Sequence, residues 1–504
     1  MDKSDQNVEL AESSDQGGNV SGCSSLEEPV NNKKLMRKID WTLLPFLTLL
    51  YLLSFLDRTN IGNARLDTLE ADLNMTGIMY NNALAIFFPF YVIAEIPSNI
   101  AMKRFAPWLW IPFIMLCWGI VCTLMGIVQS YEGLLAARAM LGLAEGGLFP
   151  GIAYFITMWY RRHECGLRLA IFFSAATLAG AFGGLLARGI LEMGGVAGLA
   201  GWRWLFIIEG IATVLVGQYT SSYTGAVLSD GIPACVAVKV MQDYPEKAKF
   251  LTESERKVGL ERLQQDRSSL ANEFDMKYVR HALSDWKIWV HVVTTICVYT
   301  GVYSYSLFLP TIIRDLGYTS RTAQLMTVPP FVVACIICVL AGWYADRLGQ
   351  RGVFMIVFMF VAIIGLIMLT AVENVAVRYV GCFFAAAGIY PSVPQGVAWN
   401  GNNIGGGLKR GIGIAMHVGF GNISGIISSY LFLPKYSPRH LPGLSSLLGL
   451  YVLALVLCVC MTAYLRRENA RRDRIYGPPD EYTEEQRELE REKGDNATFF
   501  RFTI

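Results

Sequence analysis

The sequence has few charged residues for its length. Of its 504 residues, 17% are Asp, Glu, Lys or Arg, whereas 53% are hydrophobic. Soluble globular proteins have about 25% charged residues, so this balance argues against a soluble enzyme and favours a chain whose apolar surface faces lipid. The formal net charge is only +2, which excludes a protein that binds nucleic acid by bulk neutralisation of phosphates.

Patterns typical of metal and redox sites are also lacking. The chain has 11 cysteines, but most of them lie within apolar runs. Cys335 and Cys338 form a C-x-x-C pair in an apolar run, with no second pair nearby. We therefore expect these cysteines to pack in the interior, and we expect no metal, no cofactor and no enzymatic activity.

Long apolar runs, in contrast, are abundant. A helix needs about 20 mostly apolar residues to cross about 30 Å of hydrocarbon. Suitable segments occur in two sets of six, near residues 41–58, 79–101, 108–128, 132–157, 167–188 and 201–220, and near 289–309, 325–345, 353–372, 374–398, 411–433 and 444–465. This arrangement predicts an all-α membrane protein with 12 transmembrane helices in two pseudo-symmetric six-helix bundles, as in many transporters.

The spans divide the chain into five parts. We expect a disordered cytosolic N-terminal tail over 1–38, a first bundle over 39–220, a central cytosolic loop over 221–286, a second bundle over 287–465 and a cytosolic C-terminal tail over 466–504. The N-terminal segment is polar and acidic, so we expect no cleavable signal peptide in it.

The loop charges indicate the orientation in the membrane. Basic pairs such as Lys33–Lys34, Arg161–Arg162 and Arg466–Arg467 lie on the side of the two tails, whereas only the 434–443 loop breaks the pattern. Cytoplasmic loops hold the excess of Lys and Arg, so both termini are expected in the cytosol. We expect the plasma membrane as the location and a monomer as the working unit.

The central loop contains local helical signals. Thr252-Glu-Ser-Glu255 is a capping box, which predicts a charged helix from this point to about Gln265. Met276 to Lys287 is amphipathic and leads into the seventh span, so we expect it to lie along the membrane surface.

One segment does not fit the pattern. The sixth span loses its apolar character after Gly217, and the residues that follow, as far as Pro233, are rich in turn formers. We therefore hypothesise that residues 218–238 are not native transporter sequence but the product of a wrong splice choice. The alternative is a helix whose polar end faces the bundle.

The most specific local motif follows the eighth span. Its sequence is Gly342-Trp-Tyr-Ala-Asp346-Arg347-Leu-Gly349-Gln-Arg351. It resembles the G-x-x-x-D-R-x-G-x-R loop signature of the major facilitator superfamily. Glycines permit close packing and a sharp turn, and the charged side chains can clamp helix ends, so we expect a gate here. The equivalent first-half loop keeps a basic pair, Lys103 and Arg104, but lacks the Asp.

The first half is similar to a narrower family. Ser54-Phe-Leu-Asp57-Arg58-Thr-Asn60 and Arg138-Ala-Met-Leu-Gly142-Leu-Ala-Glu145 resemble the anion:cation symporter family within that superfamily. Glu95-Ile-Pro97-Ser-Asn99 resembles its fungal branch, which includes allantoate and nicotinate permeases. The resemblance covers about residues 33–470 apart from 218–238, and its motifs are specific for the family rather than for a substrate.

The spacing within the fourth span has its own physical meaning. Two helical turns advance about 7.2 residues, so Arg138 and Glu145 project from nearly the same face. Charged side chains within spans are costly and usually face a cavity or a partner. An anion that occupies the arginine would favour protonation of the carboxylate, which couples the two. The alternative is a static ion pair that holds the fold.

The resemblance implies the remaining roles. It implies substrate binding by Arg58, Arg138, Tyr91 and Asn422, and proton coupling by Asp57 and Glu145. Alternatives from the residues themselves are snorkelling of Asp57 and Arg58 at the membrane interface and simple packing for Tyr91 and Asn422. Aromatic side chains such as Tyr303 can stack on a pyridine ring.

The predicted function is proton-coupled uptake of a small organic anion, a nicotinate- or allantoate-like carboxylate, by alternating access. The leading alternative is export of an acidic secondary metabolite, because the same charges serve either direction. A transport-inactive receptor or scaffold is a third possibility, which predicts a long ordered cytosolic domain.

Overall fold

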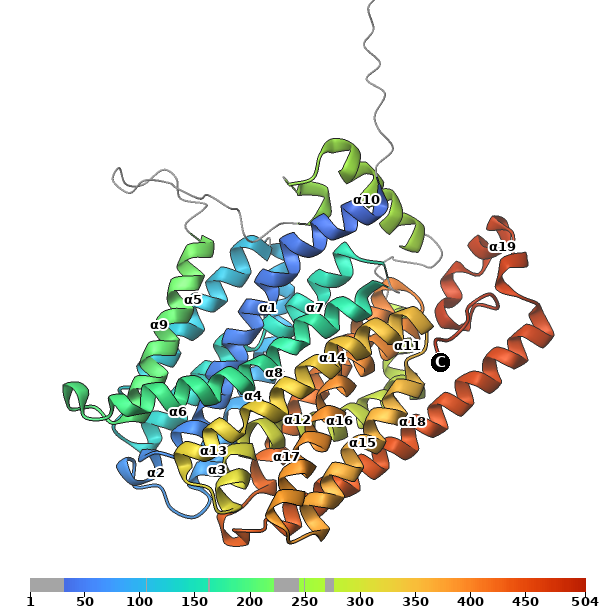
Figure 1. Ribbon diagram of the computed structural model, residues 1–504. Coiled ribbons are helices and arrows are strands. Elements are labelled where there is room, and N and C mark those ends of the chain that lie inside the picture. The colour runs from blue at the N-terminus through green and yellow to red at the C-terminus, as the bar shows by residue number, and fades with distance from the viewer. Residues whose placement is uncertain (1–30, 106, 162–163, 222–243, 249, 268–275) are drawn as a thin grey trace, which may run out of the picture.

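The computed structural model describes residues 31–504 except 106, 162–163, 222–243, 249 and 268–275. In these residues every regular element is a helix (Figure 1). The first half contains α1 (Asn32–Ala64), α2 (Leu69–Asp72), α3 (Met79–Ala85), α4 (Phe87–Arg104), α5 (Pro107–Met125), α6 (Tyr131–Glu145), α7 (Leu148–Trp159), α8 (Cys165–Ile190) and α9 (Gly201–Ser221). The rest contains α10 (Glu253–Arg267), α11 (Met276–Ser284), α12 (Trp286–Asp315), α13 (Ser320–Met326), α14 (Val328–Leu348), α15 (Gly352–Ala371), α16 (Val375–Asn402), α17 (Gly407–Leu431), α18 (Leu441–Tyr476) and α19 (Glu484–Leu489).

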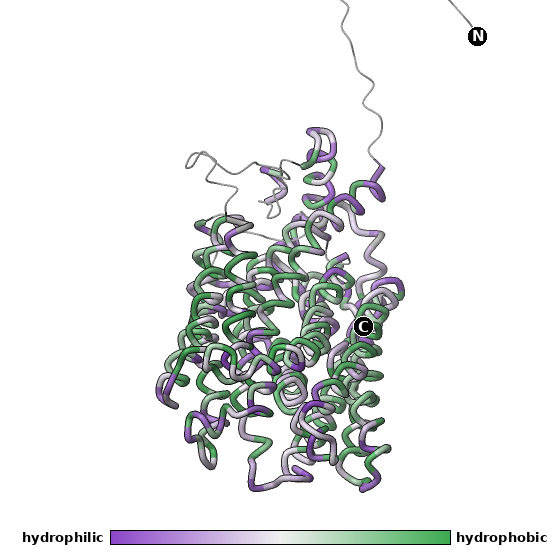
Figure 2. The backbone as a smooth tube through the Cα atoms, turned by 60° about the vertical axis from the view of Figure 1, so that its left-hand side comes forward, coloured by the Kyte–Doolittle hydropathy of each residue, from purple (hydrophilic) through white to green (hydrophobic). Residues whose placement is uncertain are grey.

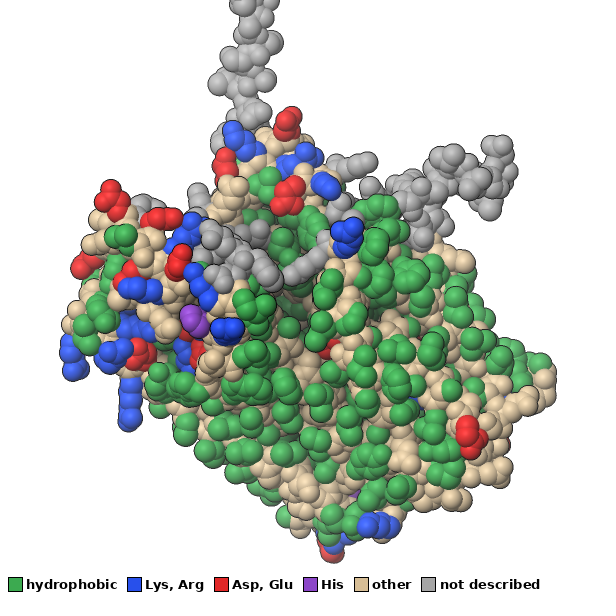
Figure 3. Space-filling model, turned by 180° about the vertical axis from the view of Figure 1, so that it is seen from behind, with side chains coloured by type: hydrophobic (Ala, Val, Ile, Leu, Met, Phe, Trp, Pro, Cys, Tyr) green, Lys and Arg blue, Asp and Glu red, His purple; other side chains and the backbone are tan. Residues whose placement is uncertain are grey.

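The helices form a membrane-spanning body. Eleven helical stretches of the described residues are long and apolar enough to cross a membrane, and α9 lies beside α1 and α5 as a further long helix. Apolar residues predominate along the packed helices, and polar ones gather toward the ends and loops (Figure 2). Green apolar side chains cover the face seen in Figure 3, where charged side chains cluster at the upper end. The predicted all-α membrane fold with two six-helix bundles is confirmed.

Each half of the chain packs mainly within itself. In the first half α1 contacts α8, α5 contacts α9 and α4 contacts α6; in the second half α12 contacts α17, and α15 contacts α16 and α18. The two bundles meet where α8 contacts α14, where α3 and α4 contact α17, and where α1 contacts α12. These seams surround the middle of the molecule, where the site lies.

The two ends of the body differ. At the end that carries α2, the bundles are joined by polar contacts: the Asn81 side chain donates to the Ser429 carbonyl at 2.5 Å, and the Tyr430 hydroxyl donates to Asn82 at 2.8 Å. The opposite end carries α10 and α19 (Figure 1). We call these ends the α2 side and the α10 side.

The helix boundaries refine the expected tails and central loop. α1 begins at Asn32, within the expected N-terminal tail, because the Asn31 side chain accepts from the Lys33 and Lys34 amides at 3.0 and 3.3 Å. The expected capping box forms at Thr252 and Glu255, and α10 extends to Arg267. α18 continues through Tyr476, well into the expected C-terminal tail.

The sixth span also runs further than its apolar run. α9 extends to Ser221, so residues 218–221 continue the helix. The rest of the segment hypothesised to be foreign, residues 222–238, lies outside the described residues.

Candidate functional site

A pocket lies between the two bundles. It is lined by Tyr51, Phe55, Arg58, Tyr91, Phe149, Phe173, Tyr299, Val302, Tyr303 and Asn422. Helices α1, α4, α7 and α8 supply the wall from the first bundle, and α12 and α17 supply the wall from the second. The walls are mostly aromatic and apolar, with one cation and a few hydrogen-bonding groups, and this composition of the lining is the one that small-molecule sites have.

The cation of this pocket is held by a buried carboxylate. Arg58 donates to Glu145 at 2.6 Å, and the two side chains are only 3% and 0% exposed. The Ser54 hydroxyl donates to the same Glu145 oxygen. The second Glu145 oxygen and the Arg58 Nε are buried and have no partner among the described residues. The pair is therefore only partly satisfied, and a ligand with both donors and acceptors can complete it.

Close approach of two helices brings Glu145 to this place. A Cβ on Gly142 would lie 2.3 Å from the Phe87 carbonyl oxygen, and a Cβ on Gly146 would lie 2.3 Å from that of Tyr91. Only glycine permits α6 to approach α4 so closely. α6 ends at Glu145, so its carboxylate points from the end of the helix toward α1.

The second bundle reaches the same cation through hydroxyl and amide groups. Tyr303 accepts from Arg58 at 3.3 Å and donates to the Asn422 side-chain oxygen at 2.6 Å. Asn422 donates to Glu95 of α4 at 3.4 Å. The Tyr91 ring faces the Arg58 guanidinium at 4.7 Å. Arg58 thus lies at the centre of a polar network that joins both bundles.

The structure places Arg138 next to the pocket rather than in its lining. Its side chain is 1% exposed, donates to the Ala83 carbonyl at 3.3 Å and lies 5.1 Å from the Phe87 ring. Arg58 lies at the same distance from the Phe87 ring. The Glu145 ion pair in the structure is made by Arg58 of α1 and not by Arg138, although Arg138 and Glu145 are both buried on α6.

Asp57 points away from its neighbour Arg58. Its carboxylate accepts from the Trp118 indole at 3.0 Å, from Thr213 at 3.1 Å and from the Cys122 thiol at 3.4 Å. These partners belong to α5 and α9, so Asp57 lies inside the first bundle. Glu209 occupies the same helix seam and accepts from Asn60.

The motif after the eighth span joins the two bundles on the α10 side. Asp346 accepts from the Leu167 amide of α8 at 2.7 Å and pairs with Arg351. Arg351 also donates to Gln395 at 2.8 Å. Asp346 is thus one point at which the second bundle holds the first, because Leu167 lies in the first turn of α8.

The other residues of this motif have distinct places. A Cβ on Gly342 would lie 2.5 Å from the Cβ of Ala170, so glycine permits the close contact between α14 and α8. Gly349 ends α14 with φ of +63°, which favours glycine. Arg347 is exposed and lies 5.5 Å from the Trp343 ring.

The first-half counterpart has no such clamp in the described residues. Lys103 and Arg104 form the end of α4, and Arg104 is exposed. Only the backbone of Lys103 belongs to the described part of the chain.

Sequence reasoning missed several members of the site, and two of them carry hydroxyl groups that bear on its chemistry. Ser54 supports Glu145, and Tyr299 lines the pocket with a buried hydroxyl that has no partner among the described residues. Tyr299 and Tyr303 are four residues apart, so helical spacing was a signal that both share one face of α12. No cluster of three or more His, Cys, Asp or Glu that could hold a metal occurs in the residues described.

Residues 47–429 match the family description Major Facilitator Superfamily. The chain belongs to this superfamily. It is 34% identical over 444 residues to the uncharacterized transporter C1002.16c of Schizosaccharomyces pombe, which covers 87% of this chain and 85% of that protein. It is also 32% identical to the MFS-type transporter efuF of Hormonema carpetanum, with 94% of each chain covered.

Solved structures show the same fold. The proton:xylose symporter XylE aligns with a TM-score of 0.61 at 14% identity, over 87% of this chain and 96% of that chain. A bacterial homologue of the lysosomal transporter Spinster aligns with a TM-score of 0.58 at 15% identity, over 84% and 96%. As a member of this superfamily, the protein is a multi-pass membrane transporter and not an enzyme.

Proposed function

We propose that this transporter takes up a small organic anion together with protons, with a nicotinate- or allantoate-like carboxylate as the substrate. The observation that carries the proposal is the buried Arg58–Glu145 pair beside the pocket between the bundles. Ionisable residues inside a membrane protein are costly and mark substrate or proton pathways. The sequence resemblance to the anion:cation symporter family supports the same conclusion.

The pair provides a route for coupling. A carboxylate substrate that binds Arg58 competes with Glu145 for the same guanidinium. Glu145 then remains buried without its cation. A carboxylate in that position is stabilised by taking up a proton, because burial disfavours its charged form. Substrate binding and protonation therefore support each other, and release of one promotes release of the other.

The remaining pocket groups suit an aromatic or amide-bearing carboxylate. Tyr91 and Tyr303 offer aromatic rings, while Asn422 and the Tyr299 hydroxyl, which has no partner among the described residues, offer hydrogen bonds from the second bundle. Alternating access requires that the substrate contacts both bundles. A substrate that binds to both then stabilises the conformation in which the two bundles close around it.

Arg138 and Asp57 act outside this first contact. We assign Arg138, behind the Phe87 ring, to binding of the substrate carboxylate once the bundles have moved, and Asp57 to a separate proton site within the first bundle. The α10 side faces the cytosol of a plasma-membrane protein in this proposal, because the basic loops lie there. The 342–351 loop and the Lys103–Arg104 pair form the cytosolic gate.

The test is uptake of radiolabelled nicotinate by cells that express the transporter, at about pH 5 and about pH 7. We compare the parent with Glu145→Gln and, as a matched control on the same helix, with the exposed Glu132→Gln. Faster uptake at the lower pH that is lost in Glu145→Gln but kept in Glu132→Gln supports proton symport.

A second assay separates coupling from binding. Glu145→Gln resembles the protonated residue, so exchange of labelled for unlabelled nicotinate across the membrane should survive even though net uptake fails. If the parent protein is present at the surface and takes up no nicotinate at either pH, the substrate assignment is wrong. If preloaded cells instead release nicotinate faster than control cells, the protein is an exporter.

A further inference from the structure

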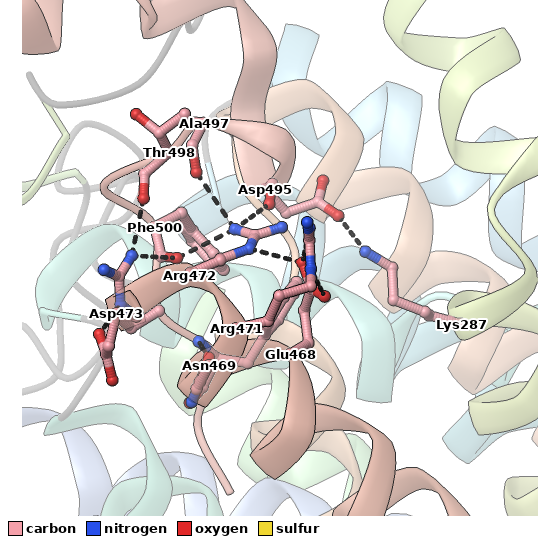
Figure 4. Close-up of polar contacts among 12 residues, drawn as sticks. Lys287, Glu468, Asn469, Arg471, Arg472, Asp473, Asp495, Ala497, Thr498 and Phe500 are labelled. Carbon is pink, nitrogen blue, oxygen red and sulfur yellow. Dashed lines mark hydrogen bonds and ion pairs between the residues drawn. The ribbon is translucent and has the colours of Figure 1, made fainter. Parts of the chain in front are cut away.

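The chain after α18 folds back onto the second bundle. α18 ends at Tyr476, and the following residues return past α19 so that Asp495–Thr503, the docking segment, lies against α12, α16, α17 and α18. Figure 4 shows its contacts with Lys287 of α12 and with the end of α18. Its apolar side chains are buried: Ala497, Phe500 and Phe502 are 0%, 8% and 5% exposed. This is the packing of a structural element rather than of a solvated tail.

A buried carboxylate anchors the segment. Asp495 is 1% exposed and pairs with Lys287 at the start of α12 and with Lys409 at the start of α17, the latter at 2.6 Å. Asp285 also pairs with Lys409, at 2.7 Å. Asp495 therefore ties together the first turns of two helices that belong to different parts of the second bundle.

Side chains of the bundle also hold the backbone of the docking segment. Asn469 donates to the Phe502 carbonyl at 2.8 Å and accepts from its amide at 2.9 Å. Asn403 does the same with Thr503, at 3.0 and 2.7 Å, and the Trp399 indole donates to the Thr503 carbonyl at 2.9 Å. Each asparagine side chain thus bonds both the amide and the carbonyl of one residue, as the backbone of a neighbouring β-strand would. These paired bonds specify the register in which the segment docks.

Arg472 satisfies the backbone carbonyl groups in the turn of the docking segment. Its guanidinium donates to the carbonyls of Asp495, Ala497 and Phe500 at 3.0 to 3.1 Å (Figure 4). A glycine permits this approach: a Cβ on Gly405 would lie 2.2 Å from the Asp495 amide nitrogen. The fit between the segment and the bundle is therefore specific in charge, in hydrogen bonds and in shape.

The docked chain reaches the gating loop. The Arg351 amide donates to the Ile504 carbonyl at 2.6 Å. The Arg351 side chain bonds Asp346 and Gln395, and Asp346 holds the Leu167 amide of the first bundle. A continuous set of bonds therefore runs from the docking segment to the contact between the two bundles.

We propose that the docking segment is a brace that positions the 342–351 loop and the first turns of α12 and α17 for closure on the α10 side. It contributes to the rate of the conformational change and not to substrate affinity. Asp495 is a positioning residue, since it acts through Lys287 and Lys409 and lies outside the pocket. The inference rests on the alternating-access function proposed above but not on the identity of the anion.

The pattern of contacts favours a brace over a plug. Within the described residues, the bonds that join Asp495–Thr503 to the membrane helices go to the second bundle, namely to Lys287, Trp399, Asn403, Lys409 and the α18 side chains. The segment therefore moves with that bundle as one body. An autoinhibitory plug would instead need to hold the two bundles together.

The Leu167 amide provides a direct test without any substrate. Leu167 is the third residue of α8, and among the described residues its amide donates to Asp346 at 2.7 Å, so its protection from hydrogen exchange reports that bond. We measure exchange in the purified full chain, in Asp495→Asn and in the control Glu488→Gln, whose side chain is exposed on α19. Chains that lack residues 478–504 form a second variant.

In Asp495→Asn we expect exchange to become about tenfold faster both in 497–503 and at Leu167, while Glu488→Gln matches the parent. Protection within α15 serves as the control for folding. Faster exchange in 497–503 with unchanged Leu167 overturns the proposal, and so does unchanged Leu167 in the truncated chain. A truncated chain that transports nicotinate faster than the parent also overturns it, in favour of autoinhibition. If the parent protein takes up no nicotinate, the substrate assignment fails, but the hydrogen-exchange result still decides whether the docking segment is a brace.

Discussion

The buried pair between Arg58 and Glu145 makes an asymmetric prediction. Both side chains are almost fully buried, and they lie 2.6 Å apart. We compare three variants: Glu145→Leu, Arg58→Met and the double variant. A guanidinium left alone remains charged at any accessible pH, whereas a carboxylate left alone can become neutral by taking up a proton. Loss of the acid should therefore cost more stability than loss of the base.

The magnitudes follow from the burial of the two groups. Breaking a buried ion pair typically costs about 3–5 kcal/mol because an uncompensated charge remains, and Glu145→Leu should lie in this range. Arg58→Met should cost about 1–3 kcal/mol, since Glu145 then needs only a proton and keeps its bond from Ser54. The double variant leaves no charge and fills similar volume, so it should recover to within about 2 kcal/mol of the parent.

The assay is the free energy of unfolding of the purified protein in mixed micelles, with denaturation followed by helical circular dichroism. Arg188→Met serves as a control, because its ion pair with Glu192 is exposed and should leave the unfolding transition unchanged. A double variant as unstable as the sum of the single variants would refute the reasoning. Nicotinate uptake by the double variant separates the roles: a stable but inactive protein shows that the pair is more than a static contact.

Three further predictions concern other parts of the molecule. Gly342→Ala places a Cβ 2.5 Å from that of Ala170 and should destabilise the protein by about 1–3 kcal/mol. The control Gly189→Ala, which has open space around it, should leave the stability unchanged. Equal shifts of the melting temperature in the two variants would contradict this prediction. Tyr299→Phe removes a pocket hydroxyl and should raise the KM for nicotinate about 5- to 30-fold at unchanged maximal rate, and an unchanged KM would exclude a contact. Burial alone would raise the pKa of Asp495, but its two lysine partners lower it below its ordinary value. Its contribution is lost only as the pH falls through that lowered value, so exchange in 497–503, corrected for intrinsic rates, should be equal at about pH 7 and about pH 5.

Much of the fold could be predicted because its signals are local. Runs of apolar residues of the right length predict the spans, and the capping residues predict where α10 begins. The loop motif predicts the superfamily, since Gly342 and Gly349 meet backbone requirements that few other residues satisfy. Burial of both Arg138 and Glu145 agrees with their spacing on one helix.

Partners on different helices could not be predicted in the same way. Adjacent residues Asp57 and Arg58 point to different helices, and Glu145 meets Arg58 of α1 rather than Arg138 of its own helix. The polar contacts of Asp495 likewise join residues that are 86 and 208 positions apart. No local pattern marks such pairs.

The sequence by itself determined the order and approximate bounds of the apolar spans, the superfamily and which charged residues lie inside the spans, because helix periodicity and hydrophobicity act over a few turns. Only the tertiary structure decided that Arg58 holds Glu145 beside the pocket, that Asp57 lies within the first bundle and that the chain beyond α18 returns to the 342–351 loop. The physical reason is that each of these contacts depends on how closely distant parts of the chain approach, helix to helix at Gly142 and loop to C-terminal segment at Gly405, and that distance is a property of the whole packed bundle.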